Sequence, residues 1–306
     1  MFMGNTFEYQ PFFMRSLYFI LFITIAFISC KSEPEVEPDL QLNKEQQQKL
    51  HMTAVSLMDA IGTNRPHVVM DQFDHKSFSK RLGKNFYQFS AQEQSLIMGT
   101  LVNTLGQSIA ALTTAIANQQ YVVRLLDTRQ DGNVSVVTLD VVTQDQQDLV
   151  NFLVLYLKEN KGGEFVLVNF YNVYDGKSFG QLAKAFLKYD FGSERIMRHL
   201  KNSMETAESA MYYEKVGEYE KAYDQMNSMS KVFRDFGQFP VYRTKLASRV
   251  NDSIYLEELE HLKELTPNEQ SRKLYDCLDL SLTGTKVTAT QCWEEFQAIL
   301  LERIED

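Results

Sequence analysis

The spacing of apolar residues changes twice along the chain, and these changes constrain the fold more than any other feature of the sequence. Over residues 43–61, and again from Ser90 to about residue 118, apolar residues recur every three or four positions, as in helices that bury one face. Residues 121–174 instead carry short runs rich in Val, Leu, Tyr and Phe, which are typical of strands. The helical spacing returns after about residue 192. The order of helices, strands and helices predicts an α+β region followed by an all-α region.

The first region begins with helices that have recognisable boundaries. Apolar residues at helical spacing predict a helix over residues 43–61, and Pro66 suits the first position of a short second helix. Ser90 and Glu93 form a capping box, in which each side chain can bind a free backbone N–H at the helix start. We therefore predict a long helix from Ser90 to about residue 118.

The middle of the chain reads as a sheet with short connections. Asp131-Gly132-Asn133 and Lys161-Gly162-Gly163 are turn signals, because Gly and Asn tolerate a positive φ. Strands joined by such short turns run antiparallel. The predicted strands are residues 121–126, 134–142, 149–157 and 164–174. A final helix follows Asp175-Gly176, so helices are expected to pack on a four-stranded antiparallel meander.

This arrangement resembles the NTF2-like, or cystatin-like, superfamily of α+β domains. The stretch VNFYNVYDGKSFGQLAKAFL resembles the closing strand and trailing helix of bacterial members of that superfamily. The resemblance covers about residues 45–188 and implies one domain over residues 42–189. It also implies a pocket between sheet and helices, which some members use to bind ligands or to catalyse reactions.

The second region, residues 192–306, is predicted to be entirely helical. The six expected helices are residues 193–215, 218–236, 239–250, 253–265, 267–282 and 288–304. Thr266 and Glu269 form a second capping box, with Pro267 at the first helical position. This is the strongest helix-start signal of the region.

The segment YYEKVGEYEKAYDQM, Tyr212 to Met226, resembles the tetratricopeptide repeat. Gly217 would permit the tight turn between two helices, Tyr219 is the aromatic residue, and Ala222 would let the two helices approach closely. Three helix pairs would satisfy the minimum for a stable solenoid. The resemblance implies a surface that binds another protein. An ordinary helical bundle with a chance GEYEKA motif is the alternative.

The N-terminal segment predicts export and lipid attachment. Leu17 to Ile28 are apolar or nearly so, too few residues for a membrane span of about 20, and Arg15 lies before them. Ser29 and Cys30 follow, and a small residue before Cys resembles the bacterial lipoprotein signal. That resemblance implies removal of residues 1–29 and acylation of Cys30, which anchors the mature protein in a bilayer. The alternatives are a secretory signal with an incidental Cys and a retained anchor helix.

The segment after Cys30 predicts where the protein works. Residues 30–41 are rich in acids and contain two prolines, so we expect an extended linker between the acyl groups and the folded body. Acids directly after the Cys also resemble surface-export signals of some Gram-negative lipoproteins. We therefore expect the cell envelope of such a bacterium, with the outer membrane favoured and the face left open. Met14 is a more natural start for this signal than Met1.

Charge and motifs exclude several functional classes. The net charge of −9 and the lack of any run of Lys and Arg disfavour nucleic acid as a partner. The sequence has no HExxH, GxSxG or P-loop motif, so we predict no catalytic residue, metal or cofactor. Asp71, Asp74 and His75 form the densest cluster of metal-ligand residue types, and a polar helix end explains them better.

Cys277 and Cys292 lie on neighbouring predicted helices. An oxidising envelope would permit a disulfide between them. Cys277 is expected in mid-helix and Cys292 near a helix start, so their heights need not match. We favour two buried thiols over the bridge. Nearby Tyr275, Trp293 and Phe296 have the spacing of core residues.

The leading hypothesis from the sequence is a membrane-anchored lipoprotein without enzymatic activity, whose helical region binds another protein. A pocket in the α+β region that binds a small ligand or performs a reaction is the alternative. A structural spacer without a dedicated ligand is a third reading.

Overall fold

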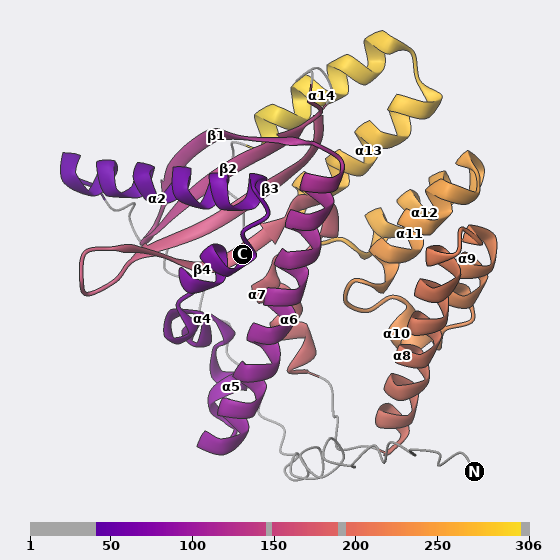
Figure 1. The fold of residues 1–306 in the computed structure, drawn as a ribbon, viewed down its shortest axis with the longest axis horizontal. Helices are drawn as coiled ribbons and strands as arrows, with labels where there is room; N and C mark the ends of the chain where they lie inside the picture. The colour runs from indigo at the N-terminus through magenta and orange to yellow at the C-terminus, as the bar shows by residue number, and fades with distance from the viewer. Residues whose placement is uncertain (1–40, 145–148, 189–193, 301–306) are drawn as a thin grey trace, which may run out of the picture.

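The computed structural model describes residues 41–144, 149–188 and 194–300, and Figure 1 shows a sheet with helices on both sides of it. The helices before the sheet are α2 (Lys44–Gly62), α3 (Pro66–Asp71), α4 (His75–Leu82), α5 (Lys84–Tyr87) and α6 (Ala91–Asn118). The strands are β1 (Val122–Asp131), β2 (Val134–Val142), β3 (Leu149–Glu159) and β4 (Phe165–Asn172). The elements after the sheet are η1 (Val173–Asp175), α7 (Phe179–Phe186), α8 (Glu194–Lys215), α9 (Tyr219–Asn227), α10 (Lys231–Arg234), α11 (Phe239–Val250), α12 (Asp252–Leu265), α13 (Glu269–Thr283) and α14 (Lys286–Leu300).

The four strands form an antiparallel meander in the order β1-β2-β3-β4, which confirms the prediction. Gly132 has a φ of 58° in the turn between β1 and β2, a conformation that costs glycine little. The outer edge of β4 is covered, because Phe73 forms a bridge with Leu167 and the N–H of Asp74 donates to the Leu167 carbonyl at 2.8 Å. β1 is longer than predicted, since its pairing with β2 continues to the turn.

One face of the sheet packs against the helices that surround it in the first region. Its core contains aliphatic and aromatic side chains from the sheet and from α2 to α7. The fully buried members include Leu57, Ile61, Phe78, Leu139 and Leu155. Burial of these side chains stabilises the packing of the helices on this face of the sheet.

The opposite face of the sheet packs against the C-terminal helices. Phe152 and Val154 of β3 share a core with residues of α12, α13 and α14, and Figure 1 shows α13 and α14 beside the sheet. The rings of Phe152 and Phe296 meet edge to face at 5.0 Å between centroids. This packing joins residues on both sides of the predicted boundary at residues 189–192. The sheet is therefore a central layer between two layers of helices.

A third core lies within α8 to α11. Ala210, Ala222, Met226, Phe233 and Leu246 are buried there. This core contains no strand residue, so these helices form a lobe that stabilises itself through its own contacts. Figure 1 shows the lobe at the side of the molecule, with α8 remote from the sheet.

Polar contacts join the sheet to α13. The Ser271 hydroxyl donates to the Val173 carbonyl at 2.5 Å, and the Tyr275 hydroxyl donates to the Tyr174 carbonyl at 2.8 Å. The Asn268 amide donates to the Gly176 carbonyl at 3.1 Å. Backbone carbonyls that leave the last strand are thus satisfied by side chains of a distant helix, which fixes the position of α13.

Most predicted helices are confirmed, and two boundaries were wrong. The expected helix over residues 218–236 is interrupted after Asn227, where the Ser228 hydroxyl donates to the Gln225 carbonyl at 2.7 Å and competes with the helical pattern. The capping box of Thr266 does not form: α13 begins at Glu269, and the Asn268 side chain binds the sheet junction instead. The box at Ser90 is confirmed, with a Ser90 N to Glu93 Oε2 distance of 2.8 Å.

Among the described residues, α6 is the one helix that is long and apolar enough to cross a membrane. Ile97, Leu101 and Leu105 recur on one side of α6 and are buried in the first core. Asn103 and Gln107 on the other side are exposed. A core helix of a folded domain shows the same division of residues.

Candidate functional site

The exposed side of α8 carries the densest set of solvent-facing large apolar side chains in the described residues. Met204, Met211, Tyr212 and Val216 are each more than half exposed, at 53%, 52%, 63% and 52%. Met211 and Tyr212 follow Met204 by seven and eight residues, which places these three along one side of α8, and Val216 comes directly after the helix ends at Lys215. Large apolar residues that gather on one exposed face mark contact surfaces more often than single exposed residues do. We call these four residues the α8 surface.

The turn after α8 and the packing of α9 orient this surface. Gly217 has a φ of 79° and connects the two helices, as the repeat-like motif predicts. Ala222 is completely buried between the helices, and Tyr219 packs partly buried against the lobe core. The buried side of α8 contributes Ala210, so Met204 and Met211 are directed to solvent.

A carboxylate at the end of α8 fixes that helix to α11. Glu214 accepts a hydrogen bond from the Tyr242 hydroxyl and an ion-paired hydrogen bond from Lys245, both at 2.7 Å. Burial opposes the charge of Glu214, but these two hydrogen bonds, together with the positive charges of Lys245 and Arg249, outweigh burial and lower its pKa. The end of α8 that carries the surface is thus joined to α11 by two side-chain contacts.

A buried ionic network connects α9 to α12 behind the surface. The Arg243 side chain is 3% exposed, and its Nε donates to Glu258 Oε2 at 2.7 Å. The Tyr223 hydroxyl donates to the other Glu258 oxygen at 2.8 Å. Asp235 contacts both Arg243, at 3.7 Å, and the His261 ring nitrogen, at 3.0 Å. Each charge has an opposite partner, which is the requirement for keeping ions in a protein interior.

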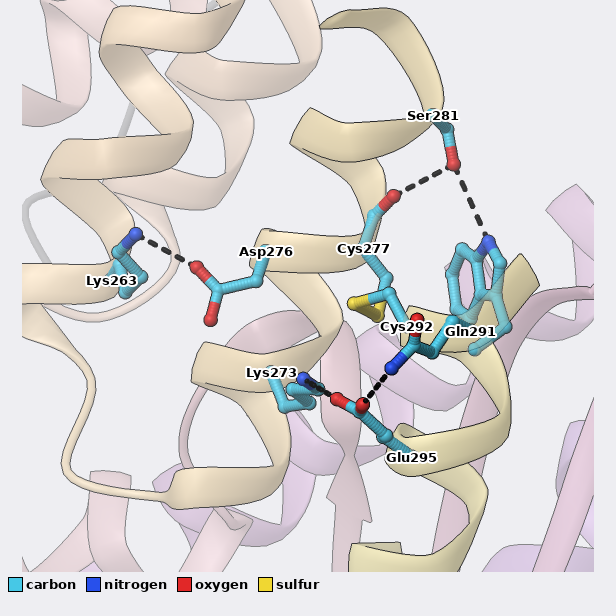
Figure 2. Close-up of a disulfide and its surroundings, with 9 residues drawn as sticks. Lys263, Lys273, Asp276, Cys277, Ser281, Gln291, Cys292 and Glu295 are labelled. Carbon is cyan, nitrogen blue, oxygen red and sulfur yellow. Dashed lines mark hydrogen bonds and ion pairs between the residues drawn. A yellow bond between two sulfur atoms is a disulfide. The ribbon is translucent and has the colours of Figure 1, made fainter. Parts of the chain in front are cut away.

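The two cysteines are bonded to each other, so the favoured prediction of two thiols was wrong. Cys277 of α13 and Cys292 of α14 form a disulfide with Cα atoms 5.4 Å apart, and Figure 2 shows it between the two helices. Their heights match because α13 and α14 form a hairpin whose loop brings both positions to one level. Tyr275 and Phe296 are buried nearby and Trp293 is partly buried, which confirms their prediction as core residues.

Ion pairs reinforce the same hairpin. Lys273 binds Glu295 at 2.7 Å across α13 and α14, and Lys263 of α12 binds Asp276 of α13 at 2.8 Å (Figure 2). Gln291 donates to Glu295 at 3.0 Å. These contacts join α12 to α13 and α13 to α14. The groups lie at the surface, so each contact contributes little to the stability of the fold.

The other predicted site residues have the following places. Cys30 lies outside the described residues. Asp74 caps the N-terminus of α4 by accepting from the backbone N–H of Lys76 at 3.0 Å, so the polar helix end predicted for Asp71, Asp74 and His75 is present. No group of three or more His, Cys, Asp or Glu side chains with metal-binding geometry occurs in residues 41–144, 149–188 and 194–300.

The space expected between sheet and helices is filled. Valine, leucine and phenylalanine side chains occupy the sheet face that an NTF2-like pocket would use. A small hollow of about 270 Å³ lies instead between the start of α2 and β1, where Leu42, Leu50, His51, Thr128 and Gln130 are among its lining residues. A wider, open depression runs along the exposed side of α6. Neither brings together groups that would perform a reaction.

Sequence reasoning missed the α8 surface. Its signal was present in the helical spacing of two Met, one Tyr and one Val, but the same residue types at the same spacing also form cores. Only the tertiary structure, which packs Ala207, Ala210 and Tyr213 of α8 against the lobe core, shows which side of α8 faces solvent.

Comparison of the chain with protein-family models, curated proteins and solved structures found no match.

Proposed function

We propose that the protein is a lipid-anchored component of a bacterial cell envelope that binds another protein through the α8 surface. The observation that carries the proposal is the exposure of Met204, Met211 and Tyr212 on one side of α8 and of Val216 directly after it. Their side chains offer a partner an adaptable apolar surface, since methionine is flexible and polarizable. Acylated Cys30 would hold this surface near a bilayer.

The disulfide supports the envelope part of the proposal. Disulfides persist in oxidising compartments such as the bacterial periplasm and the cell surface, and they are rare in the cytosol. Cys277 and Cys292 are bonded and buried in the core beside the sheet. Export is also what the apolar segment before Cys30 predicts. The outer membrane remains the proposed location, on either face.

Two domain resemblances belong to the same proposal. The helices and meander of residues 42–189 support an NTF2-like domain, and the hairpin of α8 and α9 supports a tetratricopeptide-like unit in residues 192–306. In this reading the first domain serves as a scaffold, because its sheet face is filled by apolar side chains. A partner would bind the helical region from its exposed side.

Capture from envelopes tests the surface. The acylated full chain is used as bait, and wild type is compared with a variant carrying Met204→Glu and Met211→Glu. We expect the variant to lose the proteins that wild type retains reproducibly, because each new carboxylate would have to be desolvated in the contact. Met52→Glu is the control, since Met52 is 64% exposed on α2, far from α8 in the chain.

This comparison decides whether the α8 surface binds a partner. If the α8 variant and the Met52→Glu control retain the same proteins as wild type, the α8 surface does not bind a partner. Circular dichroism of each variant verifies that the fold is kept.

The anchoring is tested separately. A Cys30→Ser variant should move from the membrane fraction to the soluble envelope fraction, because the acyl chains supply the membrane affinity. Unchanged membrane fractionation of Cys30→Ser, or an intact mass that includes residues before position 30, would contradict the proposed anchor.

A further inference from the structure

Two short segments far apart in the sequence, which contain α4 and α7, are rich in Lys and Arg although the protein as a whole is acidic. Residues 75–84 and 177–188 contain seven Lys or Arg side chains and no Asp or Glu, whereas the whole chain has a net charge of −9. The rest of the chain therefore carries −16. Neither segment is a basic run on its own, so the sequence gives little indication of the combined charge.

The fold places the two segments side by side. The rings of Phe78 in α4 and Phe179 in α7 stack at 5.1 Å between centroids. Arg81 and Lys184 are close enough that the charge of Arg81 contributes to lowering the pKa of Lys184, after the larger effect of burial. The two packed segments together carry seven basic side chains, which we call the α4–α7 patch: Lys76, Lys80, Arg81, Lys84, Lys177, Lys184 and Lys188.

The lysines of the patch have no acidic partners in the described part of the chain. No ion pair joins any of the six to a carboxylate there, although many other lysines of the protein are paired. Lys177 and Lys184 are partly buried, and burial lowers the pKa of each. Asp74, the one carboxylate at the start of α4, is engaged in capping that helix. The charge of Arg81 is partly compensated by that of Asp131, whereas an external anion would compensate the six lysines.

We propose that the α4–α7 patch docks the protein on the anionic phospholipid headgroups of the bilayer to which it is anchored. The inference rests on the proposed lipid anchor, because the anchor keeps the body close to a charged surface. Thirteen residues separate Cys30 from the start of α2. A chain of that length spans at most about 45 Å, which is comparable with the size of a domain.

Charge favours a bilayer over other anionic partners. A strongly negative protein repels a polyanion such as nucleic acid from most of its surface. A bilayer meets only one side of the body, and the attraction falls off within a Debye length of about 10 Å. The patch would therefore turn toward the membrane while the acidic remainder faces away. Docking of this kind sets the orientation in which the rest of the body meets its surroundings.

Binding to lipid vesicles tests the inference without the anchor. The full mature chain with Cys30→Ser, which keeps every described residue but carries no acyl groups, is sedimented with vesicles. We expect binding to vesicles that contain phosphatidylglycerol and much weaker binding to phosphatidylcholine alone. The variant Lys76→Gln, Lys80→Gln, Lys84→Gln should bind anionic vesicles about a hundredfold more weakly, at about fivefold for each lysine near the surface.

Three other exposed lysines provide a matched control. Lys161, Lys215 and Lys286 are exposed on other elements, and changing all three to Gln alters the net charge by the same amount. This control should lose less than about fivefold, since its charges lie outside the patch. Circular dichroism should show the same spectrum for both triple variants, because all six side chains are exposed.

Three results would overturn the inference. The first is equal binding to anionic and zwitterionic vesicles, and the second is an equal loss of binding in the patch and control variants. The third is that inorganic phosphate or poly-glutamate binds the protein at a lower concentration of negative charge than anionic vesicles do, and so releases it from them. Failure here leaves the Cys30 fractionation and α8 capture experiments unaffected, since neither depends on the patch. Failure of those experiments would leave vesicle binding intact.

Discussion

Replacing Asp175 by Asn should change how the stability of the protein depends on pH. Asp175 ends η1, where the last strand leaves the sheet and meets the helical lobe. Burial raises the pKa of its carboxyl to about 7, and hydrogen bonds from the Asn172 and Gln238 side chains lower it only in part. The titratable groups that interact with it are Tyr171, Tyr174 and Tyr275, which carry no compensating positive charge.

The sign follows from comparing the folded and unfolded states. The unfolded carboxyl releases its proton near 3.8, and the folded one keeps it to about 7. The folded state thus binds more protons between these values, so its stability falls as pH rises through that window and then levels off. At about 1.4 kcal/mol for each pKa unit, the loss is at most about 4 kcal/mol.

Urea unfolding at about pH 5 and about pH 8 measures this effect. Wild type should lose about 3 kcal/mol more between the two values than Asp175→Asn does, because Asn cannot ionise. An exposed control, Asp224→Asn, should keep the pH dependence of wild type. If Asp175→Asn shows the same pH dependence as wild type, burial does not raise the pKa of this carboxyl and the reasoning is wrong.

The layer of C-terminal helices and the lobe offer three further tests. Changing Cys277 and Cys292 to Ser should lower the free energy of unfolding by about 3 kcal/mol, as the chain-entropy model gives for a loop of 15 residues, measured by urea titration. Phe296→Ala should cost about 3–5 kcal/mol in the same titration, because its ring is fully buried against the sheet. Arg243→Met should cost about 3–5 kcal/mol by leaving Glu258 buried without its partner, and adding Glu258→Leu should restore part of the loss in thermal unfolding. If Arg243→Met alone is more stable than the variant that also carries Glu258→Leu, this account of the ion pair is wrong.

In the helical region, some features could be predicted from neighbouring residues and others could not. Gly217 and Ala222 predicted a tight turn and a close helix contact, and both are present because they depend on residues a few positions apart. The interruption after Asn227 was missed, since the serine that competes with the backbone there resembles many serines that remain helical. Asn268 illustrates the opposite case: a local capping signal lost to a distant contact with Gly176.

The sequence by itself determined the order and type of the longer elements, because periodicity, caps and turns are properties of neighbouring residues, whereas the short helices α4, α5 and α10 were not predicted. The antiparallel meander was also predicted from local turn signals such as Gly132, and the proposed export and acylation at Cys30 rest on local signals of the same kind. Tertiary structure alone decided that α13 and α14 cover the second face of the sheet, that Cys277 meets Cys292, and that α4 and α7 combine their charges. Each of these depends on which surfaces pack together across long stretches of chain, and burial of apolar area does not specify the partner surface in advance.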